Sequence, residues 1–420
     1  MQLSKKNTEI SFIIKAACAV FITYLSMYAF RKPFTAAQYS NLMLWGVDYK
    51  ILLIIAQLIG YTISKYFGIK IISELAANKR TVTLIILMAV SWISLLFFGL
   101  VPAPYNLPFI FLNGLPLGMI WGVVFSYIEG RRHTELLGVA MASSFIISSG
   151  IVKGVGSYLM LNLQVPEMWM PFFTGLVFLP VLFLGVYLLH SLSAPNEEDI
   201  HARTERKPMD IHERKAFFKR FAPGIIFSVL IYVCLTVFRD LRDNFAVEFW
   251  NSIGLKNIPS MLVFSEVPIA VLVIIIIGAM IFIKNNKNAF FINFLIVFMG
   301  GLLLFLSTIL FYNQLITPTL WMIIVGFSMY LPYIAFHALF FERWIAYFKI
   351  KSNIGFLMYV ADAAGYLGST LVLLFKNFNN TQYSWVTFFT FSAIITSVII
   401  IILSIANYLY FKKQDQLQIA

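Results

Sequence analysis

Charged residues are scarce in this sequence. Only 12% of its 420 residues are Asp, Glu, Lys or Arg, and 60% are hydrophobic. Soluble domains carry about 25% charged residues. A soluble core of this size could not bury so much apolar side chain, so the composition excludes a soluble globular protein and predicts a polytopic membrane protein.

The sequence also lacks the residue patterns of several kinds of chemistry. Its two cysteines, Cys18 and Cys234, both lie in apolar segments and offer neither a disulfide framework nor metal-ligand spacing. No Walker loop and no nucleophile elbow is present. We therefore expect no ATP-driven transport, no enzyme activity, no metal and no cofactor. The net charge of +12 could suggest a nucleic-acid partner, but the basic residues lie in short loops between apolar segments, so none is expected.

Segments long enough to cross a membrane dominate the chain. A membrane-spanning helix needs roughly 20 mostly apolar residues. Such segments occupy 10–34, 50–69, 81–101, 107–128, 136–162, 169–191, 221–246, 259–283, 289–311, 318–341, 353–375 and 383–411. The fold class predicted is all-α and polytopic, with 12 transmembrane helices in two pseudo-symmetric six-helix bundles. The predicted domains are an N-terminal bundle (1–191), a solvated cytoplasmic linker (192–218) and a C-terminal bundle (219–420).

The basic residues orient this array. Lysines and arginines gather at both termini and in the loops after the second, fourth, sixth, eighth and tenth segments. Cytoplasmic loops of membrane proteins carry an excess of these residues. We therefore predict that both termini are cytoplasmic, in a multi-pass protein of an inner (cytoplasmic) membrane.

The two halves of the chain repeat one signature. Tyr24 is followed seven residues later by Arg31, and Tyr232 is followed seven residues later by Arg239, near the end of the first apolar segment of each half. A six-span repeat in parallel orientation is typical of two bundles related by an axis along the membrane normal. Within the fourth segment, Gly114, Gly118 and Gly122 recur every four residues and predict a tight packing face.

This organisation resembles the major facilitator superfamily. Within it, Tyr28-Ala-Phe-Arg31-Lys32-Pro33-Phe34 resembles the first-helix motif of the organophosphate:phosphate antiporters. The stretch with Ser64-Lys65-Tyr66, Ser73-Glu74 and Asn78-Lys79-Arg80 resembles the loop after their second helix, although Glu74 stands where an aspartate is usual. The chain is also similar to an uncharacterised bacterial subfamily of these carriers, which leaves the substrate open.

The resemblance implies that Arg31 and Arg239 bind the phosphate of a substrate. A planar guanidinium can donate to two oxyanions at once, which suits a phosphate or a carboxylate. The alternative is that both arginines extend to the membrane interface. Because the position is repeated, we favour a binding role and include Tyr24 and Tyr232 among the candidate substrate-binding residues.

Two more basic residues are candidates for substrate binding. Arg242 shares a helical face with Arg239, and Asp240 or Asp243 could neutralise an arginine in the absence of substrate. A solvated loop is the alternative for Arg242, Asp243 and Glu248. Lys153 lies among serines and glycines, where it either provides a third cation near the arginines or extends outward to the interface.

Two carboxylates are candidates for proton coupling. Asp362 lies near the middle of the eleventh segment, where it either pairs with a basic residue such as Lys153 or titrates. Glu266 in the eighth segment is the second candidate. His337 is interpreted as a packed histidine.

Four charged residues occupy cytoplasmic helix ends in matching places of the two halves. We expect them to form inter-helix salt bridges that stabilise one conformation, which is gating work. They are Glu129, Arg131, Glu342 and Arg343.

The sequence therefore predicts a secondary active transporter with alternating access for a small organic anion, with a phosphate ester as one candidate, driven by anion exchange or proton coupling. The alternatives are a transporter-like sensor of a phosphorylated metabolite and, less favoured, a membrane-embedded enzyme. The partners expected are the small anionic solute and membrane lipid, and the protein is expected to be a monomer.

Overall fold

The chain folds almost entirely into helices. The structure, a computed structural model, describes residues 2–40, 42–73, 75–129, 131, 133–194, 197, 199, 211–254, 259–348, 354–378 and 384–419. Among these residues the sheet content is one short antiparallel hairpin, in which β1 (Met43–Leu44) pairs with β2 (Val47–Asp48). The predicted all-α class is confirmed.

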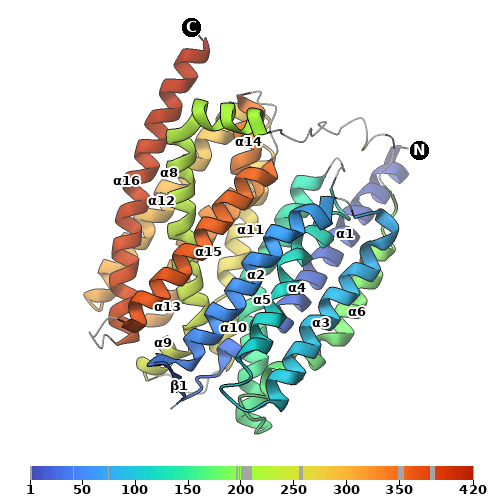
Figure 1. The fold of residues 1–420 in the computed structure, drawn as a ribbon. Coiled ribbons are helices and arrows are strands. Elements are labelled where there is room, and N and C mark those ends of the chain that lie inside the picture. Colours follow the sequence, from blue (N-terminus) through green and yellow to red (C-terminus); the bar gives the residue numbers. More distant parts are fainter. Residues whose placement is uncertain are drawn as a thin grey trace. The chain divides into compact units, whose positions relative to one another are not determined.

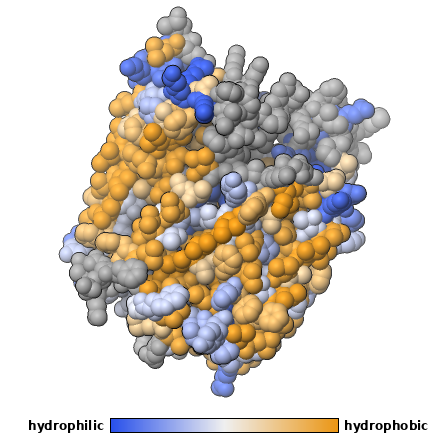
Figure 2. Space-filling view, viewed as in Figure 1, coloured by the Kyte–Doolittle hydropathy of each residue, from blue (hydrophilic) through white to orange (hydrophobic). Residues whose placement is uncertain are grey.

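Eleven helices of the described chain are long and apolar enough to cross a membrane. A further helix, α15 (Ile354–Phe378), covers the remaining predicted segment. Many large apolar side chains on these helices are exposed, and in Figure 2 hydrophobic residues cover the visible sides of helices such as α2 and α16. A surface of this kind suits lipid rather than water. The protein is therefore a multi-pass membrane protein.

The chain divides into two compact units. Unit 1 comprises Met1–Arg203 and Asn244–Val267, and unit 2 comprises Thr204–Asp243 and Pro268–Ala420. Of the predicted linker, 192–218, residues 195–196, 198 and 200–210 lie outside the described residues, and its last part, from Ile211, belongs to α8 (Ile211–Asn244). The segment Asn244–Val267 joins unit 1 although unit 2 precedes and follows it in the sequence, which the analysis of spans does not predict.

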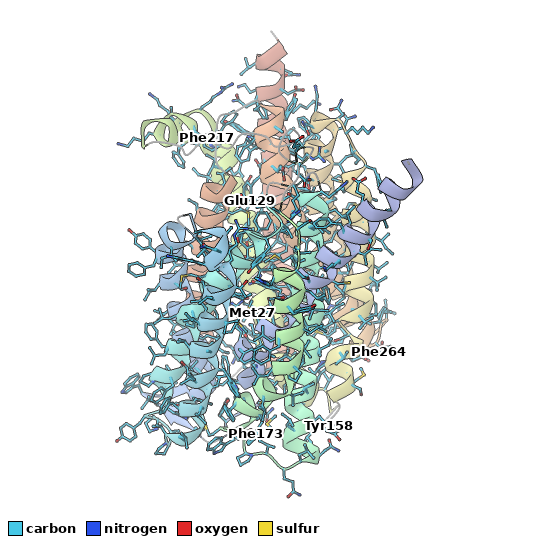
Figure 3. All side chains as sticks on the ribbon, turned by 90° about the vertical axis from the view of Figure 1, so that its right-hand side faces the viewer. Met27, Glu129, Tyr158, Phe173, Phe217 and Phe264 are labelled. Atoms are coloured by element: carbon cyan, nitrogen blue, oxygen red, sulfur yellow. The ribbon has the colours of Figure 1, made fainter. Side chains whose placement is uncertain are left out.

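Unit 1 contains six long helices (Figure 1). They are α1 (Gln2–Arg31), α2 (Tyr49–Ser73), α3 (Arg80–Leu100), α4 (Leu107–Phe125), α5 (Thr134–Asn162) and α6 (Met170–His190). Shorter elements are η1 (Pro33–Ala36), η2 (Ala77–Lys79), α9 (Ala246–Ser252) and α10 (Pro259–Phe264). Figure 3 places Glu129 and Tyr158 toward opposite ends of this unit, with Met27 between them.

The glycine face predicted in the fourth span is confirmed. A Cβ atom added at Gly114 would lie 2.4 Å from the carbonyl oxygen of Gln57, and one at Gly118 would lie 2.6 Å from that of Tyr61. Helix α4 therefore packs backbone to backbone on α2, because a larger side chain would separate the two helices. This contact fixes the part of α2 that faces the end of α1.

Unit 2 contains the remaining long helices together with two short helical elements. They are α8 (Ile211–Asn244), α11 (Val267–Ile281), α12 (Asn286–Tyr312), α13 (Pro318–Ala335), the π-helical turn η3 (Phe336–Phe340), α14 (Phe341–Tyr347), α15 and α16 (Trp385–Ile419). Helix α15 approaches α8 closely, since a Cβ atom at Gly365 would lie 2.9 Å from the hydroxyl of Thr236 and one at Gly368 2.8 Å from Val233. This contact brings the signature tyrosine and arginine of α8 beside the polar residues of α15.

Candidate functional site

Arg31 is the last residue of α1 and is almost fully buried, with 5% of its surface exposed. The helix ends here because Pro33 has no N–H to donate to the preceding turn, and η1 follows at once. The guanidinium carbon of Arg31 lies 4.1 Å from the ring centre of Tyr61 and 5.9 Å from that of Tyr28. Arg31 thus faces other residues of unit 1 from within the protein interior rather than extending outward.

Two buried side-chain amides fix the end of α1. The amide of Asn113 donates to the carbonyl oxygen of Phe30 and to the carbonyl and hydroxyl oxygens of Ser91. The amide of Gln57 donates to the carbonyl oxygen of Arg31 and to Oδ1 of Asn113, at 2.7 Å each. Carbonyls in the last turn of a helix lack intrahelical partners. These amides satisfy two of them and hold the backbone that carries Arg31, a role that the sequence analysis missed.

A buried ion pair lies beside the same end of α1. The ammonium group of Lys50 donates to Oε1 of Glu248 and, at 2.7 Å, to the carbonyl oxygen of Thr35. The ammonium of Lys32 donates to Oδ1 of Asn244 at 2.8 Å. These contacts attach the start of the segment Asn244–Val267 to unit 1. The loop interpretation of Glu248 is wrong, because its side chain is only 12% exposed and pairs with Lys50.

The same segment rests on α5. A Cβ atom at Gly150 would lie 2.4 Å from the carbonyl oxygen of Leu262 and 2.8 Å from Cγ of Glu266. Lys153, one turn further along α5, is 2% exposed, and its charge acts on the ammonium of Lys50. Lys153 is therefore buried among the polar groups of unit 1 rather than extended to solvent. Glu266 is also buried, at 7% exposed.

The eighth span is broken where Glu266 lies. Helix α10 ends at Phe264 and α11 begins at Val267. Pro268 has no N–H for the carbonyl oxygen of Phe264, which interrupts the helical hydrogen-bond ladder. A discontinuous transmembrane helix places backbone polar groups inside the membrane, and such breaks occur at transport sites.

In unit 2, Arg239 contacts both a carboxylate and a ring. Its Nη2 and Nε atoms lie 2.8 and 3.2 Å from Oδ1 of Asp240. The hydroxyl of Ser369 donates to Oδ2 of Asp240 at 2.7 Å. The guanidinium carbon lies 4.3 Å from the ring centre of Tyr333. Asp240 thus neutralises Arg239 in this structure, as the sequence analysis considered.

A buried polar network surrounds Tyr232. Its hydroxyl donates to Oδ1 of Asp362, and it lies 2.7 Å from Nε2 of His337 and 3.3 Å from the hydroxyl of Tyr333. A hydroxyl has one proton, so when it donates to Asp362 it accepts from the neighbouring donors. His337 is the second residue of η3 and lies five residues after Pro332 of α13. The expectation of a merely packed histidine missed this hydrogen bond.

The remaining candidate binding residues are also buried. Arg242 donates from Nη2 to the carbonyl oxygen of Met322 at 3.2 Å, and Asp243 is 7% exposed. The ring of Tyr24 packs at a tilt against that of Phe145, with ring centres 4.9 Å apart. Burial contradicts the solvated-loop alternative for Arg242 and Asp243.

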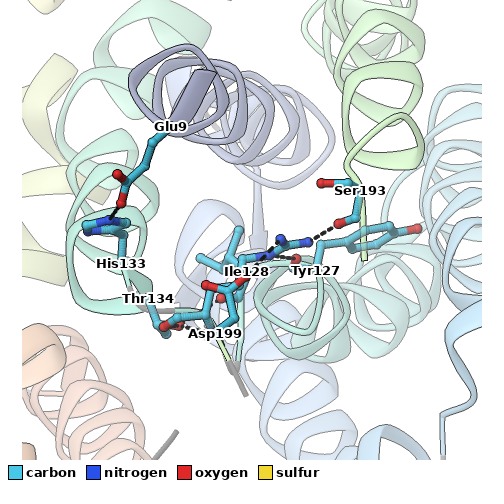
Figure 4. Close-up of polar contacts among 8 residues, drawn as sticks. Glu9, Tyr127, Ile128, His133, Thr134, Ser193 and Asp199 are labelled. Atoms are coloured by element: carbon cyan, nitrogen blue, oxygen red, sulfur yellow. Dashed lines mark hydrogen bonds and ion pairs between the residues drawn. The ribbon is translucent and has the colours of Figure 1, made fainter. Parts of the chain in front are cut away.

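The other end of unit 1 holds two of the predicted gating residues, Glu129 and Arg131, and Figure 4 shows the polar contacts at this end. Arg131 lies 4.0 Å from Oδ2 of Asp199 and donates to the carbonyl oxygens of Ser193 and Tyr127. Nearby, Nε2 of His133 lies 2.7 Å from Oε1 of Glu9. Burial lowers the pKa of Arg131 from its ordinary value, and Asp199 opposes that shift.

The other three gating candidates divide between the units. Glu129 is exposed at the same end of unit 1. In unit 2, Arg343 is buried and donates to Oδ1 of Asn286 at 2.8 Å, next to half-buried Glu342. The loop-motif residue Glu74 lies outside the described residues. The gating role of all four residues stays a prediction.

The structure therefore places the candidates in two groups. Arg31, Tyr24, Lys153 and Glu266 belong to unit 1. Arg239, Arg242, Tyr232 and Asp362 belong to unit 2. Each signature pair, tyrosine and arginine, lies within one unit, and a clamp of both arginines on one anion stays a prediction.

These features define an all-α multi-pass membrane protein. Two solved structures of the nucleoside transporter NupG are similar to it. One matches with a TM-score of 0.63 and 13% identity over 96% of this chain and 99% of NupG. The other, of a mutant, matches with a TM-score of 0.61 and 10% identity over 94% and 98%.

The family follows from the sequence match. The chain belongs to DUF5690, a family of unknown function, whose model matches residues 33–414. No curated protein matches the chain.

Proposed function

We propose that this protein is a secondary transporter for a small organic anion, working by alternating access. The observation that carries the proposal is the pair Arg31 and Arg239. Each arginine follows a tyrosine by seven residues at the end of the first long helix of its half, and each is at most 8% exposed. A buried guanidinium in a membrane helix is costly and marks a substrate or ion pathway far more often than a structural role.

The anion is a carboxylate or a phosphate ester. Both groups present two oxygens to the planar fork of a guanidinium. One oxygen of Asp240, Oδ1, already accepts from Nη2 and Nε of Arg239, at 2.8 and 3.2 Å. A substrate oxyanion that takes its place leaves Asp240 with its hydrogen bond from Ser369, so the displaced carboxylate keeps one donor.

The similarity to NupG supports the fold and not the substrate. Nucleosides carry no net charge, whereas unit 1 buries four basic residues. Arg31 and Lys32 are adjacent in the sequence, and the charge of Lys153 acts on Lys50. Buried cations need anionic partners. The carboxylates Glu248 and Glu266 belong to the same unit, and the charge of Glu167 also acts on Lys50. We propose that the solute that unit 1 contacts is anionic.

Proton coupling is the second part of the proposal. Asp362 is buried and bonded to Tyr232, whose hydroxyl also contacts His337. A carboxylate would repel an anionic substrate, so its presence beside the proposed site has a better explanation in proton uptake. Anion exchange without Asp362 is the alternative driving mode.

Gating at the Lys50 end is the third part. The contacts of Lys50 with Glu248 and of Lys32 with Asn244 attach the segment Asn244–Val267 to unit 1. By the positive-inside pattern this end faces outward. These two contacts would stabilise a conformation closed on that side, and they complement the inner candidates Glu129, Arg131, Glu342 and Arg343.

A binding screen followed by counterflow tests the proposal. Purified protein is heated with a panel of carboxylates, phosphate esters and nucleosides, and the stabilising compounds are loaded into proteoliposomes. The proposal predicts stabilisation by anions and exchange of labelled anion against unlabelled anion. Stabilisation by nucleosides alone would overturn the anionic substrate, and binding without flux would favour the sensor.

A further inference from the structure

We infer that Tyr61 and Tyr333 are positioning residues that hold the guanidinium planes of Arg31 and Arg239 so that their edges receive an oxyanion. The inference rests on the proposed function and deepens it. The distances from guanidinium carbon to ring centre are 4.1 Å for Arg31 on Tyr61 and 4.3 Å for Arg239 on Tyr333. All four side chains are buried.

The two arginine–tyrosine contacts do not follow from the repeated signature. Tyr61 lies on α2, the second span of the first half, whereas Tyr333 lies on α13, the fourth span of the second half. The signature tyrosines, Tyr24 and Tyr232, are different residues. Two unrelated helices thus supply the same partner to the two equivalent arginines, which points to a shared task.

A ring suits this task because of its geometry. It attracts a guanidinium through its π face and covers one side of the plane, which limits rotation about the side-chain bonds. The N–H donors lie in the guanidinium plane and point outward from the edge of that plane, so they stay available to an oxyanion when a ring lies against its face. An aromatic partner therefore orients the fork without neutralising it, whereas a carboxylate partner neutralises it.

Unit 2 shows this arrangement with an anion in place. The guanidinium carbon of Arg239 lies 4.3 Å from the ring centre of Tyr333, while Nε and Nη2 donate to Oδ1 of Asp240. The Asp240 carboxylate stands in for the substrate oxyanion at the edge of the fork. A carboxylate or phosphate approaching Arg31 in the same way would meet the fork held by Tyr61.

Both tyrosines are themselves fixed. The backbone of Tyr61 lies against Gly118 of α4, where an added Cβ atom would be 2.6 Å from the tyrosine carbonyl oxygen. The hydroxyl of Tyr333 lies 3.3 Å from that of Tyr232. These contacts hold the backbone of Tyr61 and the hydroxyl of Tyr333, and we infer that each ring in turn holds its arginine.

The test uses the purified full-length protein in detergent, with inorganic phosphate as the anionic probe and uridine as the neutral one. Tyr61→Leu and Tyr333→Leu remove the π face, and each should weaken phosphate binding about tenfold. Tyr61→Phe and Tyr61→Trp keep a π face and should bind within about twofold of wild type. Tyr66→Leu on the same helix is the control, because Tyr66 is 76% exposed.

A second measurement separates positioning from folding. In a Tyr61→Leu background, Arg31→Lys should cost less than it does alone, because Tyr61 acts through Arg31. Tyr333 provides an independent arm if Tyr61→Leu does not fold, with Tyr312→Leu, at a residue 74% exposed, as its control.

The outcomes discriminate this inference from the proposed function. Leucine variants that bind phosphate like wild type, while Arg31→Lys and Arg239→Lys bind weakly, would overturn the positioning role alone. If Tyr61→Phe bound phosphate as weakly as Tyr61→Leu, the positioning role would also be overturned, since the hydroxyl and not the face of the ring would then matter. Wild-type protein that binds uridine and no phosphate would overturn the proposed function and this inference together.

Discussion

The hydroxyl of Tyr232 donates a hydrogen bond to Oδ1 of Asp362, 130 residues further along the chain, and it lies 2.7 Å from Nε2 of His337. The three groups form a continuous hydrogen-bonded path inside unit 2. The charges of Arg239 and Tyr333 also act on Tyr232. Two predictions follow from this path.

Replacing Asp362 with Asn removes the titrating group and keeps the shape. We expect Asp362→Asn to lose the stimulation of uptake by an inward proton gradient, because the amide cannot carry a proton across. Exchange of anion against anion should continue. Proteoliposome uptake at a series of external pH values measures both, with exchange at symmetric pH as the internal control. Wild-type dependence on pH in the variant would rule out this role for Asp362.

Replacing His337 with Gln tests the hydrogen-bonded path from Tyr232 to His337 rather than Asp362 alone. Glutamine can still contact Tyr232, but it does not titrate near neutral pH. We therefore expect His337→Gln to shift the pH profile of uptake more than it changes the affinity for phosphate, since its described contacts are with Tyr232 and Tyr333. Tyr232→Phe breaks the path at its middle and should shift the same profile. Profiles that overlay wild type in both variants would show that the network is only structural.

The Lys50–Glu248 pair should control the conformational balance at its end of the protein. Glu248→Gln removes the charge and leaves Lys50 buried without its counter-ion, which weakens any conformation that needs the pair. A switch contact of this kind typically shifts an equilibrium by about 1–3 kcal/mol. Double electron–electron resonance between labels on α2 and α12, with and without Glu248→Gln, measures the change. The control is Asp48→Asn, at an exposed residue of β2. Unchanged distance distributions in Glu248→Gln would contradict the gating role.

Orientation in the membrane is testable with single cysteines. In a background with Cys18 and Cys234 replaced by serine, Tyr105→Cys should react with an impermeant thiol reagent added to intact cells. Lys284→Cys should react only after the cells are opened, because the positive-inside pattern puts its loop in the cytoplasm. Both positions are exposed. The reverse pattern of labelling would invert the topology and place the Lys50–Glu248 pair on the inner side.

The fold could be predicted from the sequence because each membrane span is specified by the composition of its own segment. Twenty-residue apolar stretches specify the spans, and glycines such as Gly114 and Gly118 mark the contact of α4 with α2. The repeated tyrosine–arginine spacing likewise identified two buried arginines. Each of these signals lies within a single segment and can be found without knowing its neighbours.

The partners of those residues could not be predicted in the same way. Glu248 lies 198 residues from Lys50, and His337 lies 105 residues from Tyr232. No local period links such residues, so only the packing of helices brings them together. In the sequence, Asn113 and Gln57 are single polar residues in apolar spans, and no pattern distinguishes them from others of that kind. The break at Glu266 did have a signal, since Pro268 follows two residues later and cannot continue the hydrogen-bond ladder.

The central claim is that Arg31 and Arg239 jointly bind one anion. Replacing either with lysine keeps the charge and loses the fork. Charge-assisted hydrogen bonds contribute roughly 1.5–3 kcal/mol each, so each single variant should lose about ten- to a hundredfold in affinity. The double variant should lose less than the sum of the singles in free energy, because either change already breaks the shared contact. Arg220→Lys, at an exposed residue on the same helix as Arg239, is the control.

The most direct measurement is the affinity of purified protein for inorganic phosphate in Arg31→Lys, Arg239→Lys, the double variant and Arg220→Lys. The account predicts weak binding in both single variants, a double variant only slightly weaker, and wild-type affinity in Arg220→Lys. Near-wild-type affinity in both single variants would contradict the shared anion site, and with it the main reason for an anionic substrate.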